Sequence, residues 1–180
     1  MRVEKERQGI IFIFMLGFLV GIIYANMIAG SYVTTTSVFH ENYLNQYLQV
    51  DYITVDYIFY LMKYRSLPLI ILCLMATTRY RKIAAVIIML WTGFSAGVLA
   101  VTAVLCMGAA GMLVCLAALF PHFIFYGVSY LIVIWYCLGD TGTKWNKVKS
   151  MVVFLMLIAG IMAEGYLNPW IMKMVISILL

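Results

Sequence analysis

The chain has 180 residues, of which 66% are hydrophobic and only 11% are charged, and its formal net charge is +5. A soluble globular domain carries about 25% charged residues, so this composition excludes an ordinary water-soluble fold. The basic residues are divided among separate short segments, which argues against a nucleic-acid-binding patch. We therefore predict one integral membrane domain over residues 1–180, built as an all-α bundle of transmembrane helices and in contact with membrane lipids.

The first apolar run covers residues 9–29. At about 1.5 Å per helical residue it crosses a hydrocarbon core of about 30 Å, and it is longer than the apolar core of a signal peptide. Gly17 and Gly21 form a Gly-x-x-x-Gly pair, a pattern that lets two helices approach closely. We expect a retained span with a helix-packing face.

The one sizeable polar stretch covers residues 31–65 and contains seven tyrosines. Tyrosine favours the headgroup layer because its ring is apolar and its hydroxyl is polar. We predict an extracytoplasmic amphipathic segment at about 31–65, made of short helices on the outer membrane surface. A docking surface for an extracellular partner is the functional alternative.

The next apolar run, residues 67–78, is short for a span, so the crossing is expected to start at about Leu61. Pro68 then lies inside the helix and should kink it. Lys63 and Arg65 would extend to the outer interface.

A further long run, residues 83–106, carries a second Gly-x-x-x-Gly pair at Gly93 and Gly97. One glycine pair could pack within the chain and the other between chains. Self-association into a homo-oligomer is therefore one expectation.

Residues 108–120 are apolar but too short to cross, whereas residues 123–138 are long enough. We predict a re-entrant or broken helix near 108–122, followed by one crossing. A last span starts at Met151, and the segment from Gly165 to Pro169 is expected to break it before a short C-terminal helix.

Basic residues fall on one side of this arrangement, which has about five crossings, with six as the alternative. The nine residues assigned to the inside are Arg2, Lys5, Arg7, Arg79, Arg81, Lys82, Lys144, Lys147 and Lys149. Cytoplasmic loops of membrane proteins carry such an excess of lysine and arginine. We expect a multi-pass membrane protein with its N-terminus in the cytoplasm.

Polar residues also occur at the two predicted helix interruptions. Pro121 and His122 lie at the first, and Glu164, Asn168 and Pro169 at or near the second. An intramembrane carboxylate usually has a partner or a task. We consider these residues a candidate polar intramembrane site for an ion, a proton or a partner, with a His122–Glu164 contact as one hypothesis. Location in the headgroup layer beside water is the alternative.

Known catalytic and metal-binding motifs are absent from the sequence. The four cysteines lie in apolar runs without a Cys-x-x-Cys pair, as expected for small buried apolar side chains. An intramembrane protease would need Ser95, Ser129 or Ser177 with His122 as its base. We predict no catalytic residue, no metal ion and no cofactor.

The ordered set of these features resembles the stage II sporulation protein M family. The resemblance rests on Pro121-His122 after a glycine-rich apolar run, on the segment Glu164 to Pro169, and on the two glycine-containing spans. The family has glycine and glutamate where this chain has Phe123 and Tyr126, which removes one of two intramembrane carboxylates. Asn168 stands where the family often has threonine.

The resemblance implies a protein of the bacterial cytoplasmic membrane that acts as a non-enzymatic scaffold. It would recruit other membrane or extracytoplasmic proteins, as in the recruitment of peptidoglycan-degrading partners during engulfment. Other relatives occur beside circular bacteriocin genes, where they assist export or immunity. The sequence leaves both roles open.

Overall fold

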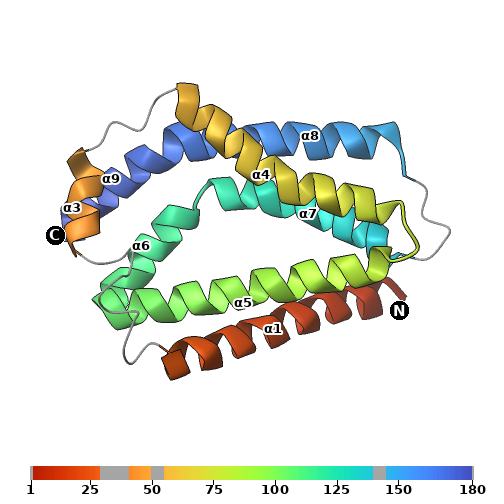
Figure 1. The fold of residues 1–180 in the computed structure, drawn as a ribbon, viewed down its shortest axis with the longest axis horizontal. Coiled ribbons are helices and arrows are strands. Elements are labelled where there is room, and N and C mark those ends of the chain that lie inside the picture. Colours follow the sequence, from red (N-terminus) through yellow and green to blue (C-terminus); the bar gives the residue numbers. More distant parts are fainter. Residues whose placement is uncertain (1, 29–40, 50–54, 140–144, 180) are drawn as a thin grey trace. The chain divides into compact units, whose positions relative to one another are not determined.

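The structure is a computed structural model, and it describes residues 2–28, 41–49, 55–139 and 145–179. All regular secondary structure in these ranges is helical, which confirms the predicted all-α fold (Figure 1). The elements are α1 (Arg2–Ile28), α3 (Glu41–Gln49), α4 (Val55–Ala76), α5 (Arg81–Met107), α6 (Ala109–Leu119), α7 (His122–Leu138), α8 (Lys147–Met162), the π-helical turn η1 (Ala163–Leu167) and α9 (Asn168–Leu179).

Four helical stretches in the described part of the chain are long and apolar enough to cross a membrane. They are Gly9–Met27, Val55–Ala76, Arg81–Met107 and Lys147–Leu179. The pair α6 and α7, bent at a short break, makes a fifth if it counts as one span. The predicted set of about five spans with a broken helix near 108–122 is thereby confirmed, and the protein is a multi-pass membrane protein.

The chain divides into two compact units. Unit 1 comprises Met1–Val50, Ile87–Ala118 and Ile171–Leu180, and unit 2 comprises Asp51–Val86 and Leu119–Trp170.

In unit 1, helices α1 and α5 pack through all four of the predicted packing glycines. A Cβ atom at Gly17, Gly21, Gly93 or Gly97 would collide with backbone of the facing helix. One at Gly21 would lie 3.1 Å from the Cα of Phe94, and one at Gly97 would lie 3.2 Å from the Cα of Gly21. Both Gly-x-x-x-Gly pairs therefore pack against each other within one chain, and side chains larger than hydrogen would separate the helices.

The connection from α5 to α6 is a tight reversal at Gly108. Its φ of +60° lies in the left-handed region that glycine adopts without steric cost. Gly111 then lies directly against the backbone carbonyl of Ala103, where an added Cβ would collide. The predicted broken helix near 108–122 thus begins with a helical hairpin between α5 and α6, whose close packing depends on Gly108 and Gly111.

Unit 2 is built from α4, α7, α8 and η1, with α7 packed along α8 and α4 against both (Figure 1). Its core includes Leu72, Val133 and Cys137, each fully buried. The Ser129 hydroxyl donates a hydrogen bond of 3.1 Å to the Val153 carbonyl and so ties α7 to α8.

Helix α4 begins at Val55, inside the predicted surface segment, and it continues through Pro68. Within that predicted segment the structure also describes α3, where Leu44 is buried and Tyr43 is exposed. Residues 29–40 and 50–54 of the segment lie outside the described residues.

The predicted helix break between Gly165 and Pro169 is wrong. Helices α8 and α9 form one continuous stretch through η1, where the Asn168 N–H donates to the Ala163 carbonyl in π-helical spacing. Pro169 has no N–H for the Gly165 carbonyl, and its ring crowds the preceding turn. One wide π turn accommodates both effects without interrupting the helix.

Candidate functional site

Three polar side chains from separate helices meet inside unit 2: Arg65 of α4, Tyr126 of α7 and Glu164 of η1. We call them the polar cluster. The Arg65 Nε donates to both carboxylate oxygens of Glu164, at 3.1 and 2.9 Å, and its Nη2 donates to Oε1. The Tyr126 hydroxyl donates to Oε2 of the same carboxylate at 2.8 Å.

The two charged members of the polar cluster differ in exposure. The Glu164 side chain is 7% exposed and that of Arg65 is 47% exposed. The Glu164 carboxylate is therefore almost completely removed from solvent and is hydrogen-bonded by protein donors instead. About half of the Arg65 side chain remains exposed. A carboxylate withdrawn from water in this way is stable only when it is paired and hydrogen-bonded.

Arg65 lies near the middle of the candidate span Val55–Ala76 rather than at its end. The guanidinium of Arg65, which we predicted to extend to the outer interface, pairs with Glu164. Its Cζ also lies 5.6 Å from the centroid of the Tyr126 ring, within the range of a cation–π contact. A planar, bidentate donor suits both contacts better than a lysine would.

Gly160 of α8 provides the space for the Tyr126 ring. A Cβ at Gly160 would lie 2.5 Å from Cε1 and 2.7 Å from Cδ1 of that ring. Gly127, the next residue on α7, has open space where its Cβ would be. A Cβ at Gly165 of η1 would lie 3.5 Å from Cγ1 of Ile58 of α4, an ordinary contact distance. Of these three glycines, Gly160 is the one that the polar cluster requires.

His122 is buried at the start of α7, with its ring edge-on to Tyr126 and the two ring centroids 5.7 Å apart. Among the described residues no partner reaches its Nδ1 atom. The donors recorded for Glu164 are Arg65 and Tyr126, so Tyr126 occupies the position that we had considered for His122.

The other predicted site residues flank the polar cluster along the chain. Pro121 precedes His122 and is half-buried, while Asn168 and Pro169 follow η1, half-buried and buried respectively. Arg65, Tyr126 and Gly160 were not predicted from the sequence as members of this cluster. Tyr126 stands four residues after His122, a spacing that places both on one helix face. No local pattern marks Arg65, which is 99 residues away from Glu164.

This arrangement is an internal ion pair whose carboxylate is hydrogen-bonded by protein donors. Three donor groups occupy the Glu164 carboxylate, and together they join α4, α7 and η1. In the part of the chain that the structure describes, no three His, Cys, Asp or Glu side chains are grouped to hold a metal ion. The geometry therefore fixes helices relative to one another within unit 2.

Comparison with known proteins gave no match: no family model, no curated protein and no solved structure matches this chain.

Proposed function

We propose that this protein is a non-enzymatic multi-pass membrane scaffold that recruits partner proteins, in the manner of the stage II sporulation protein M family. The observation that carries the proposal is the polar cluster, in which Glu164 is already paired with Arg65 and Tyr126 of the same chain. A carboxylate held in this way stabilises one helix arrangement. A fixed arrangement is what a scaffold needs to present partner-binding surfaces.

Helix α3 is the surface on which we propose that partners bind. It exposes Tyr43, Asn45 and Gln46 while Leu44 is buried. Tyrosine and amide side chains contribute contact area and hydrogen bonds at protein interfaces. We place this helix on the extracytoplasmic side of a bacterial cytoplasmic membrane, with the N-terminus in the cytoplasm. The distribution of lysine and arginine along the chain supports this orientation.

A photo-crosslinking amino acid at Tyr43 tests the scaffold proposal in intact cells. We expect crosslinks to extracytoplasmic proteins, because the side chain is 52% exposed on a polar helix. The matched control is Phe12, which is 69% exposed in the candidate span Gly9–Met27 and is expected to crosslink to lipid. Absence of protein crosslinks at Tyr43, Asn45 and Gln46 under all growth conditions would contradict the proposal.

The second candidate function is a membrane component of an export or immunity system, such as bacteriocin secretion. It is favoured by His122 at the break between α6 and α7, because no described residue provides a partner for its buried Nδ1 atom. Polar groups at helix interruptions form binding sites in transporters. Under this function His122→Ala reduces export while the fold persists. Full export by His122→Ala would rule out a role for this histidine.

A further inference from the structure

A surface groove lies between α7 and α8 in unit 2, separate from the polar cluster. Its volume is about 360 Å³, within the range of roughly 300–1,000 Å³ that is usual for ligand clefts. The lining residues are Ile132, Trp135 and Tyr136 of α7 and Val148, Lys149 and Val152 of α8.

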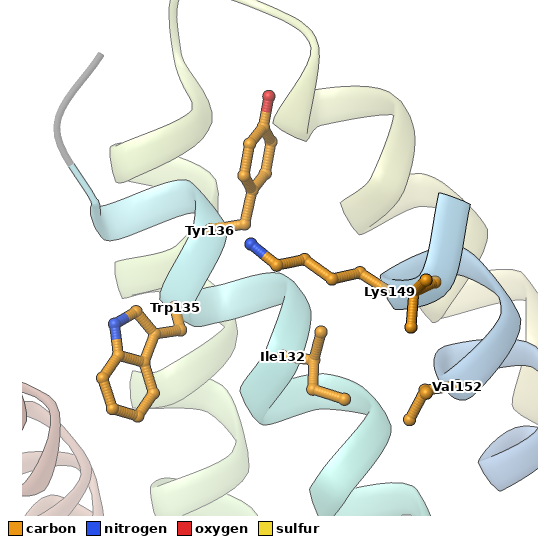
Figure 2. A pocket seen from close by; sticks show the side chains of 6 residues that line it. Ile132, Trp135, Tyr136, Lys149 and Val152 are labelled. Carbon is orange, nitrogen blue, oxygen red and sulfur yellow. The ribbon is translucent and has the colours of Figure 1, made fainter. Parts of the chain in front are cut away.

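The floor of the groove is apolar, and the groove opens on the outer surface of the two helices. Ile132 and Val152 face each other across it from the two helices (Figure 2). Trp135 is 46% exposed and Val148 is 63% exposed, so the groove opens on the outer surface of the helices. Because α7 and α8 belong to candidate membrane spans, lipid chains are the solvent on that surface.

Positive charge and aromatic rings surround one end of the groove. The Lys149 side chain extends from α8 toward α7 and ends beside Tyr136 (Figure 2). Arg81 places its Cζ 5.7 Å from the Tyr136 ring centroid and donates to the Gly139 carbonyl at 3.1 Å. The Trp145 ring packs edge-on against Tyr136, with centroids 4.9 Å apart. Tryptophan, tyrosine and basic side chains together mark the headgroup layer of a membrane.

We propose that this groove binds one anionic phospholipid. Its phosphate lies at Lys149, near Arg81, and an acyl chain lies along Ile132 and Val152. Basic pockets between transmembrane helices bind anionic headgroups through the attraction of lysine and arginine. The apolar floor favours a lipid over a soluble anion, because a free phosphate would leave Ile132 and Val152 uncovered.

Native mass spectrometry of the purified full chain tests the proposal. The probes are phosphatidylglycerol and phosphatidylcholine with identical acyl chains. We expect preferential retention of phosphatidylglycerol, and about fivefold weaker retention in Lys149→Ala, since one lysine near an anionic membrane surface contributes about that factor. The control is Lys147→Ala, which removes the same charge from the exposed start of α8 and should bind like the unchanged protein.

A second variant tests the apolar half of the groove. Val152→Phe fills it without changing any charge and should also reduce phosphatidylglycerol retention. Equal retention of the two lipids by the unchanged protein would overturn the proposal, as would unchanged binding by both Lys149→Ala and Val152→Phe. Complete displacement of the lipid by millimolar inorganic phosphate would instead assign the site to a soluble anion.

Discussion

Replacement of Arg65 by alanine should lower the free energy of unfolding by about 3–5 kcal/mol, the usual cost of leaving a buried charge without its partner. The variant leaves the Glu164 carboxylate, which is 7% exposed, without its counter-charge. The Tyr126 hydroxyl would remain as the one donor recorded for it within the described structure. Reversible unfolding in mixed micelles, followed by circular dichroism, measures the loss.

Lys63→Ala is the matched control, because Lys63 is an exposed basic residue two positions earlier on α4. It should change the free energy of unfolding by no more than a few tenths of a kcal/mol.

Glu164→Gln should cost less than Arg65→Ala, since the Gln side-chain oxygen can still accept hydrogen bonds from Arg65 and the charge left behind is the less buried one. Equal, small losses for Arg65→Ala and Lys63→Ala would show that the ion pair does not stabilise the fold.

The hydrogen bond from Tyr126 to Glu164 allows an independent test that the polar cluster stabilises the fold. Gly160→Ala brings a methyl group against the Tyr126 ring and should displace the hydroxyl from Glu164. Gly127→Ala, with open space at its Cβ position, should be neutral or slightly stabilising because alanine is the better helix former. A combined Gly160→Ala/Tyr126→Phe variant should lose less than the sum of the two single variants.

Gly21→Ala should destabilise unit 1 by about 1–3 kcal/mol, the range for overpacking a close contact. The new Cβ would collide with the Phe94 carbonyl, which is backbone and cannot rotate away as a side chain would. Helices α1 and α5 would then have to move apart, which would also disrupt the close contacts at Gly17, Gly93 and Gly97. Thermal unfolding monitored by size-exclusion chromatography measures the effect.

Gly9→Ala is the control on the same helix, since nothing lies within 4 Å of its Cβ position. It should match or slightly exceed the stability of the unchanged protein. If Gly21→Ala unfolds at the same temperature as Gly9→Ala, the close α1–α5 contact is not required for stability.

The sequence predicts the membrane spans well because bilayer thickness imposes a length on each apolar run. Residues 9–29 and 83–106 contain the candidate spans of α1 and most of α5 for this reason. The glycine pairs were also predictable, because a small-residue repeat on one helix face has a direct packing consequence. Their mutual pairing within one chain was not, since the pattern does not specify the facing helix.

The polar cluster was only half predictable. Glu164 is conspicuous because a carboxylate in an apolar run is costly. Its partner Arg65 was assigned to the interface, because the span was taken to start at about Leu61 rather than at Val55. The π turn was missed because Pro169 is compatible with either a break or a locally widened helix. Contacts between residues so far apart in sequence depend on tertiary packing.

We propose that these apolar helices lie in lipid, with their basic connections on the cytoplasmic face. The most direct test is labelling with a membrane-impermeant maleimide, using single cysteines at Asn45 of α3 and Lys147 of α8 in a variant without the four native cysteines. We predict that Asn45→Cys is labelled in intact cells and that Lys147→Cys is labelled only after permeabilisation. Labelling of Lys147→Cys in intact cells, or recovery of the protein in the soluble fraction without detergent, would contradict this arrangement in the membrane.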